Sequence, residues 1–170
     1  MIHVTPMRHL GETLQATKAR HLLTLLSAGD VFTRPEGLDP DQCLHLSMHD
    51  IAAPREGLTA PAREHVAAIL DFARRWAGNP KAPLVIHCHA GISRSPAAAY
   101  AIAASLQPTR DEEDLARELR RRSPMATPNP LIVAHADALL GRAGRMIAAI
   151  SAIGRGADAF EGAPFSLDWR

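Results

Sequence analysis

The sequence predicts an α/β fold of three layers, in which a central, mostly parallel sheet of four to five strands is flanked by helices. Three observations support this prediction. Short apolar runs alternate with longer segments of helical periodicity, Gly, Pro or Asp bounds the runs, and 46% of the 170 residues are hydrophobic. Such alternation is typical of helices packed on a parallel sheet, and the length suits one domain with a substantial core.

Four apolar runs are predicted to be strands. Three of them, residues 2–5, 43–48 and 83–88, are short and clearly bounded by turn-forming residues. The fourth, residues 21–27, is ambiguous, because the sequence TLQATKARHLLTLL (residues 13–26) also fits one continuous helix.

Two central helices are predicted from their start signals. The first follows Pro61, carries its apolar residues on one face, and stops at the Gly-Asn-Pro sequence of residues 78–80. The second begins with a capping box formed by Thr109 and Glu112. Its acidic start (DEED) and basic end (RRR) both suit the helix dipole.

A last long helix is predicted to open at Asn129-Pro130 and to end at Gly154, with an apolar inner side made of Leu139, Leu140, Ala143, Met146, Ile147 and Ile150. We therefore predict a single domain at residues 1–153. Residues 154–170 are Gly-rich without periodicity and form a C-terminal tail, which we expect to pack back through Phe160, Phe165 and Trp169.

The charge and the cysteine content limit the function. A formal net charge of +1 gives no global field to attract nucleic acid or an anionic membrane surface, so we expect neither as a partner. Cys43 and Cys88 are too few for a disulfide scaffold, and the N-terminus lacks a signal-peptide core. We expect a cytoplasmic protein in which Cys43 is a strand residue, with a regulatory disulfide to Cys88 left open.

The stretch VIHCHAGISRSP (residues 85–96) holds the candidate chemistry. If Cys88 ends a buried strand and Pro96 lies in the first turn of the next helix, Ser95 is expected to cap that helix. Gly91 allows the connecting loop to turn tightly. Backbone N–H groups of such a loop can converge on a tetrahedral dianion, and Arg94 adds a planar guanidinium that can bind two of its oxygens.

The same surroundings favour a reactive sulfur. Helix N-termini and nearby cations stabilise a thiolate relative to a thiol. The sequence therefore predicts that Cys88 is a nucleophile facing a bound phosphoryl group.

His87-Cys88, five residues with Gly91 in the middle, and then Arg94-Ser95 resemble the signature of the cysteine-dependent protein tyrosine and dual-specificity phosphatases. Pro96 favours the dual-specificity branch. Strand order, an upstream acid and the following helices extend the likeness from about residue 2 to residue 150.

The resemblance implies a metal-independent, two-step hydrolysis of a phosphomonoester, without any cofactor. Cys88 would form a cysteinyl-phosphate that water then hydrolyses, Ser95 would assist the second step, and His87 would brace the loop through backbone hydrogen bonds. The phosphate would be bound by His89, Ala90, Gly91, Ile92, Ser93 and Arg94.

The family also places an aspartic acid on a separate upstream loop to protonate the leaving group. Asp50 follows a predicted strand directly and precedes a Pro/Gly-rich loop, 38 positions before Cys88. Its context makes it a better candidate than Asp39, Asp41 and Glu56. Asn129 matches an asparagine common in dual-specificity phosphatases, although helix capping also explains it.

Two other functions are alternatives, a sulfurtransferase and a non-catalytic phosphate-binding module. A metal site at residues 87–89 is disfavoured, because alternation along a strand points both histidines away from Cys88. A rhodanese-type sulfurtransferase would not need the Arg94-Ser95 pair or Asp50, and a non-catalytic module would bind phosphate without turnover. The substrate is expected to be a phosphorylated protein or a small phosphomonoester, since the loop lacks the lysines associated with phosphoinositide pockets.

Overall fold

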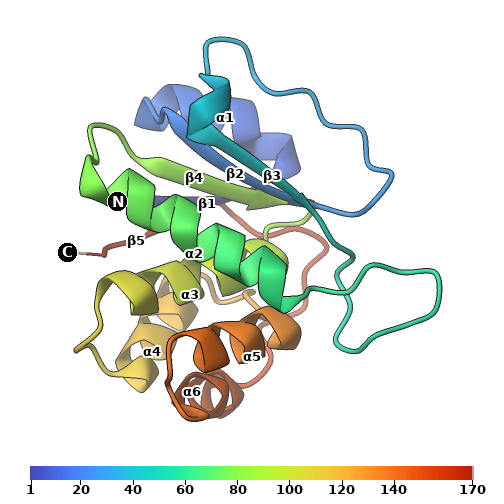
Figure 1. Cartoon of the computed structure of the whole chain (residues 1–170), viewed down its shortest axis with the longest axis vertical. Helices are drawn as coiled ribbons and strands as arrows, with labels where there is room; N and C mark the ends of the chain where they lie inside the picture. The colour runs from blue at the N-terminus through green and yellow to red at the C-terminus, as the bar shows by residue number, and fades with distance from the viewer. Residues whose placement is uncertain (170) are drawn as a thin grey trace.

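A computed structural model describes residues 1–169 and contains a five-stranded sheet with the order β3-β2-β4-β1-β5 (Figure 1). All neighbouring strands are parallel except β5, which runs antiparallel to β1. The strands are β1 (Ile2–Pro6), β2 (His21–Leu26), β3 (Cys43–Ser47), β4 (Leu84–Cys88) and β5 (Phe165–Leu167). The predicted mostly parallel sheet is confirmed.

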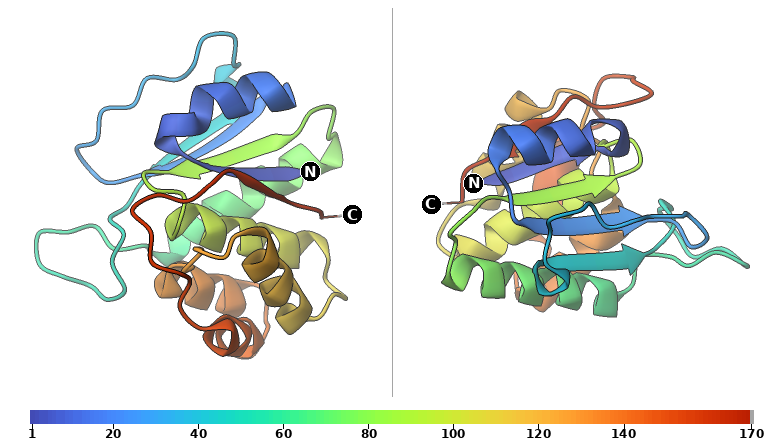
Figure 2. Two further views of the ribbon diagram at one scale, coloured as in Figure 1. Left: turned by 180° about the vertical axis from the view of Figure 1, so that it is seen from behind. Right: turned by 90° about the horizontal axis from the view of Figure 1, so that it is seen from above.

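Helices cover both faces of the sheet, also as predicted. α1 (Leu10–Thr17) lies on one face, and α2 (Arg63–Gly78) to α6 lie on the other (Figures 1 and 2). The remaining helices are α3 (Arg94–Leu106), α4 (Glu112–Arg122), α5 (Pro130–Leu139), α6 (Arg145–Ile153) and the short 3-10 turns Met7–His9 and Pro40–Gln42. None of the helices within residues 1–169 is both long and apolar enough to span a membrane.

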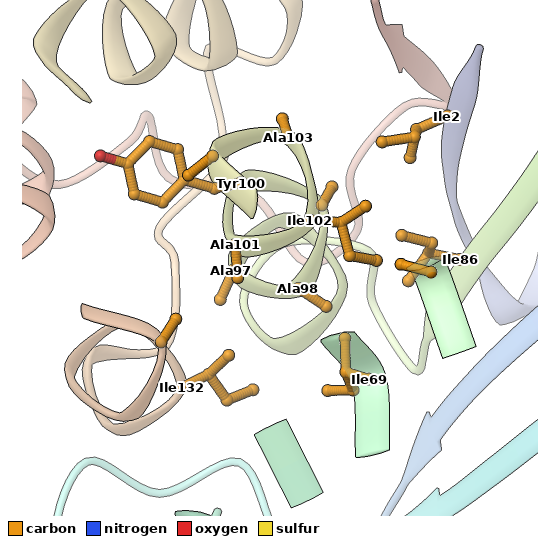
Figure 3. Packing of buried hydrophobic residues seen from close by; sticks show 14 of the residues in the cluster. Ile2, Ile69, Ile86, Ala97, Ala98, Tyr100, Ala101, Ile102, Ala103 and Ile132 are labelled. Atoms are coloured by element: carbon orange, nitrogen blue, oxygen red, sulfur yellow. The ribbon is translucent and has the colours of Figure 1, made fainter. Parts of the chain in front are cut away.

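α3 is the centre of the larger core. All of its residues from Arg94 to Ala104 are buried, and many are alanines, which allow close approach to the neighbouring elements. Figure 3 shows Ile86 of β4 and Ile69 of α2 on one side of α3, and Ile132 of α5 on another. The connection between β4 and α3 therefore starts and ends in rigid, buried structure.

The ambiguous segment at residues 13–26 is a helix followed by a strand. α1 ends at Thr17, and Lys18 then adopts a left-handed conformation with φ of 55°. The chain re-emerges as β2, whose residues Leu22 and Leu23 are fully buried. Pairing with both β3 and β4 decides against a continuous helix, which is a tertiary effect that local periodicity does not contain.

The predicted long helix from residue 130 to 153 is wrong, because the chain breaks it into α5 and α6. Gly141 and Gly144 adopt positive φ angles between the two helices. The carboxylate of Asp137 then accepts hydrogen bonds from the N–H groups of Gly144 (2.7 Å) and Met146 (3.0 Å) at the start of α6. The turn rotates Ile147 outward, so that it is exposed and not on the inner side.

The predicted Thr109–Glu112 capping box is also wrong. α4 is capped by Asp111, whose side chain accepts from the N–H groups of Glu113 (2.9 Å) and Asp114 (3.0 Å). Glu112 is instead buried and forms ion pairs with Arg142 and Arg145. The acidic first turn and the basic last turn of α4 are present as expected.

The C-terminal tail joins the sheet of the domain. Phe165 to Leu167 form β5 beside β1, and Trp169 packs on Trp76 with ring centroids 5.1 Å apart. Phe160 does not pack back, since its side chain is fully exposed. That part of the tail prediction is wrong.

Candidate active site

The candidate site lies at the carboxyl end of β4, where the loops that follow the parallel strands converge (Figure 2). Cys88 is the last residue of β4 and is 1% exposed. Its Sγ lies 3.0 Å from the hydroxyl oxygen of Ser95. Ser95 is therefore not the helix cap that we predicted: α3 begins at Arg94, and the hydroxyl of Ser95 faces the thiol from the first turn.

Residues 89–93, hereafter the anion loop, direct their carbonyl groups outward. Four of these five carbonyls accept hydrogen bonds of 2.8–3.3 Å from backbone N–H groups outside the loop. The carbonyl of His89 accepts from Met7, that of Ala90 from Gly162, and that of Ile92 from Thr127. The carbonyl of Ser93 accepts from both Ala97 and Asn129. In a planar trans peptide the N–H group points opposite to the carbonyl. The following N–H groups are consequently turned toward the inside of the loop, where an anion can accept from them.

Gly91 is required by its conformation and by a close contact. Its φ is 68°, and a Cβ atom there would lie 2.8 Å from the backbone nitrogen of Pro6 at the end of β1. Contacts this short do not occur for real side chains. The tight turn inferred from the sequence thus brings the anion loop directly against β1.

Arg94 is buried (4% exposed) and anchored through one end of its guanidinium. Nη1 donates to the carbonyl of Met48 (2.8 Å) and to the hydroxyl of Ser27 (3.3 Å), which follow β3 and β2. Nε is buried without a hydrogen-bond partner within residues 1–169. Because Nε and Nη2 form the edge that binds two oxygens of a tetrahedral anion, the orphaned Nε indicates where such an anion would bind.

Asp50 reaches the anion loop, unlike its rival Asp39, which caps the 3-10 turn at residues 40–42. Its Oδ1 accepts from the hydroxyl of Ser93 at 2.6 Å, and its Oδ2 lies 3.9 Å from Nε of Arg94. The side chain is 36% exposed. A carboxyl group at this place lies beside the anion loop and still has access to solvent.

Asn129 connects this acid to the rest of the fold. Its side-chain oxygen caps α5 by accepting from the N–H groups of Leu131 (3.1 Å) and Ile132 (3.2 Å). Its amide nitrogen donates to Oδ1 of Asp50 at 2.8 Å and to the carbonyl of Ile51 at 3.1 Å. The cap therefore also holds the acid in place.

His87 lies on the opposite side of β4 from Cys88. Its Nε2 is 2.9 Å from the hydroxyl of Thr24 on β2, and its ring is 5.2 Å from that of Phe32. Burial lowers the pKa of His87 to about 4, so the ring is neutral near pH 7. It links β4 to β2 just below the anion loop.

Cys43 is far from this chemistry. Leu22 of β2 pairs with both Cys43 and Val85, so Cys43 lies level with Val85 and two strand spacings from β4. That separation is about 9.5 Å, whereas disulfide Cα atoms are at most about 7 Å apart. A bond between Cys43 and Cys88 is excluded in this fold, and burial raises the pKa of the Cys43 thiol.

Metal-ligating side chains do not gather at the site. In the part of the chain that the structure describes, no three His, Cys, Asp or Glu side chains are arranged to hold a metal ion. The residues that do converge are a thiol, a hydroxyl, a guanidinium, a carboxyl group and inward backbone amides.

Several solved structures with a similar architecture are described as dual-specificity phosphatases or as tyrosine phosphatase-like. Human DUSP28 matches with a TM-score of 0.62 and 16% identity over 84% of this chain and 92% of that chain. DUSP15 matches with a TM-score of 0.59 and 17% identity, covering 89% of each chain.

The chain has the fold of the dual-specificity phosphatases. A third structure, the human tyrosine phosphatase-like serine/threonine/tyrosine-interacting protein, matches with a TM-score of 0.61 and 17% identity over 82% of this chain and 87% of that chain. No family model and no curated protein sequence matches the chain. At these identities the likeness establishes the fold, and the activity has to be argued from the site itself.

Several contacts that build the site were not apparent from the sequence. The hydroxyl of Ser93 contacts Asp50, and the carbonyl of Met48 contacts Arg94. The backbone N–H group of Thr127 binds the anion loop. A contact made by backbone atoms does not require a particular residue type, so the sequence gives no signal for it. Asn129 had a signal, because it opens a helix and also matches a family position, but its second bond to Asp50 required the fold.

Proposed function

We propose that the protein is a metal-independent phosphomonoester hydrolase of the cysteine-dependent, dual-specificity type, acting through a cysteinyl-phosphate. The observation that supports this most directly is the outward orientation of the anion-loop carbonyls. It turns backbone N–H groups toward the end of β4, where Cys88 lies. A phosphoryl group bound there would be held by these amides and by Arg94, with the sulfur behind its phosphorus atom.

In the first step Cys88 attacks phosphorus as a thiolate, and a sulfur–phosphorus bond forms as the bond to the leaving oxygen breaks. Charge spread over the three other oxygens is stabilised by the loop amides and Arg94. Asp50 donates its proton to the leaving oxygen. Its bonds to Ser93 and Asn129 support this role, since they fix the carboxyl group beside the anion loop.

In the second step water attacks phosphorus, Asp50 accepts a proton from that water, and the sulfur–phosphorus bond breaks. Inorganic phosphate is released and the thiolate is regenerated. The hydroxyl of Ser95, 3.0 Å from Sγ, is placed to donate a hydrogen bond to the departing sulfur.

The composition of the anion loop supports an inference about the substrate class. The loop interior has no lysine. We favour a phosphorylated protein over a small phosphomonoester, acting in the cytoplasm, where a free nucleophilic thiol is maintained.

Hydrolysis of p-nitrophenyl phosphate in the presence of a chelator tests the proposal. Cys88→Ser should lower kcat by about 10⁴-fold or more, because it removes the nucleophile. Cys43→Ser is the matched control and should retain full activity, since Cys43 is remote from the site. Full activity of Cys88→Ser contradicts the proposal.

Two outcomes would indicate the alternative functions. Transfer of sulfur from thiosulfate to cyanide, without phosphate release, would indicate a sulfurtransferase. Tight binding of a phosphopeptide without hydrolysis would indicate a non-catalytic binding module.

A further inference from the structure

The C-terminal tail passes along the outer side of the anion loop before it forms β5. It leaves α6 after Ile153, runs past the loop and pairs with β1 from Phe165 onward (Figure 2). Two of its glycines, Gly156 and Gly162, contact the structure around the loop.

Gly162 binds the anion loop directly. Its N–H group donates to the carbonyl of Ala90 at 2.8 Å, and the residue is buried. A Cβ atom at Gly162 would lie 3.1 Å from the carbonyl oxygen of Gly91 and 3.5 Å from that of Ala90. The backbones of the tail and the loop are thus packed closely, and a side chain at Gly162 would crowd the carbonyl of Gly91.

Gly156 holds the loop indirectly. Its N–H group donates to the hydroxyl of Thr127 at 3.1 Å, while the N–H of Thr127 donates to the carbonyl of Ile92 at 2.8 Å. A Cβ atom at Gly156 would lie 2.5 Å from the carbonyl group of Met125. The tail therefore fixes the segment that in turn binds the other half of the loop.

β5 determines where Gly162 lies. It begins three residues later, and its Leu167 and Phe165 pair with Ile2 and Val4 of β1. The end of β1 contacts the anion loop as well, through Pro6 against Gly91 and through the bond from Met7 to His89. The pairing of β5 with β1 and the contacts of β1 with the anion loop therefore hold the tail and the anion loop in one fixed arrangement.

We propose that this tail is a positioning element of the active site, which keeps the peptide between Ala90 and Gly91 oriented with its carbonyl outward and its N–H inward. Without the Gly162 bond this peptide can rotate, which removes one amide donor from the pocket and turns a carbonyl dipole toward the anion. Both changes weaken phosphate binding and transition-state stabilisation. The inference about turnover rests on the proposed function, whereas the inference about anion binding does not.

Gly162→Pro tests the proposal, because it removes the N–H group; it also adds a Cβ atom, so its effect is compared with that of alanine, which adds the same Cβ. Gly162→Ala is a milder second variant that keeps the N–H and crowds Gly91. Gly11→Ala is the matched control, because a Cβ at Gly11 meets nothing within 4 Å and its φ is not in the left-handed region. Melting temperatures identify any variant that fails to fold.

Gly162→Pro should weaken inhibition by inorganic phosphate by about tenfold and lower kcat for p-nitrophenyl phosphate by roughly 10²-fold. Gly162→Ala should show smaller losses in the same direction, and Gly11→Ala should show none. A folded Gly162→Pro variant with wild-type phosphate inhibition and kcat overturns the proposal.

A second measurement does not depend on turnover. Iodoacetate is an anion and iodoacetamide is neutral, so the ratio of their alkylation rates at Cys88, read by peptide mass spectrometry, reports the anion preference of the pocket. Gly162→Pro should lower this ratio by about tenfold relative to wild type and Gly11→Ala. An unchanged ratio overturns the tail's positioning role even if the wild type hydrolyses nothing, and a lowered ratio supports it in that case too.

Discussion

The anion loop and the loop that carries the acid are held in opposite ways. The anion loop lies between two buried elements, and four of its five carbonyls are bound from outside. The acid loop, residues 49–60, is exposed from residue 52 to residue 59. Within the described chain its contacts with the site are the two side-chain bonds to Asp50, the bond from Asn129 to Ile51, and the ion pair of Asp50 with Arg94 at 3.9 Å.

This difference matches the two tasks. An oxyanion pocket works best when its donors are fixed before the reaction, since no reorganisation is then needed as charge develops. A proton donor has to admit the substrate and release the product, and lightly bonded loops open at low free-energy cost. Changes in the anion loop should therefore affect every substrate, whereas changes in the acid loop should depend on the leaving group.

The largest effect in this comparison is expected for Arg94→Lys. Lysine retains a positive charge but cannot donate two parallel bonds or keep the anchors to Met48 and Ser27 at once. We expect kcat/KM to fall by roughly 10³-fold, equally for p-nitrophenyl phosphate and for phenyl phosphate. A loss confined to one of the two substrates would contradict a fixed pocket.

Asp50→Asn should lower kcat/KM, which reports the step in which the leaving group departs, by roughly 10²-fold when the leaving group is poor. The loss should shrink for p-nitrophenyl phosphate, because nitrophenolate departs without a proton. Glu56→Gln in the same loop is the matched control and should remain near wild type. If Asp50→Asn lowers kcat/KM equally for both substrates, Asp50 is not the acid.

Asn129→Ser separates capping from acid positioning. Serine caps helices well, so the melting temperature should change little, but it lacks the amide that reaches Asp50. We expect kcat for phenyl phosphate to fall by about tenfold, with KM nearly unchanged. A large loss of stability with unchanged kcat would assign Asn129 to the cap alone.

The smallest effect concerns stability and His87. Burial holds its pKa at about 4 in the folded chain, against about 6.5 in the unfolded chain. As the pH falls below 6.5 the unfolded state gains a proton that the folded state does not, so stability decreases toward pH 4, by about 2 kcal/mol at pH 5. Denaturant unfolding at pH 7 and pH 5 should show that the free energy of unfolding falls more in the wild type than in His87→Gln. Equal decreases in the two proteins would contradict the prediction.

Local signals in the sequence were sufficient for three of the five strands (β1, β3 and β4), the anion loop and the order of the candidate residues, whereas β2 stayed ambiguous and β5 lies in the segment predicted to be a tail. They failed where a tertiary contact decided between two local choices. Asp137 caps α6 across a turn, Glu112 is buried by two arginines, and Ser95 faces a thiol and does not cap its helix. The role of the tail was invisible because its contacts are made by glycine backbones.

The central claim is that Cys88 forms a covalent bond to phosphorus within the anion loop, and Ser95→Ala allows this intermediate to be trapped. Without the hydroxyl 3.0 Å from Sγ, breakdown of the cysteinyl-phosphate should slow by about tenfold. Rapid mixing with p-nitrophenyl phosphate should then give a burst of nitrophenol equal to the enzyme concentration, with phosphate on the peptide that contains Cys88. Turnover without a burst, and with no phosphate on that peptide, would contradict the account.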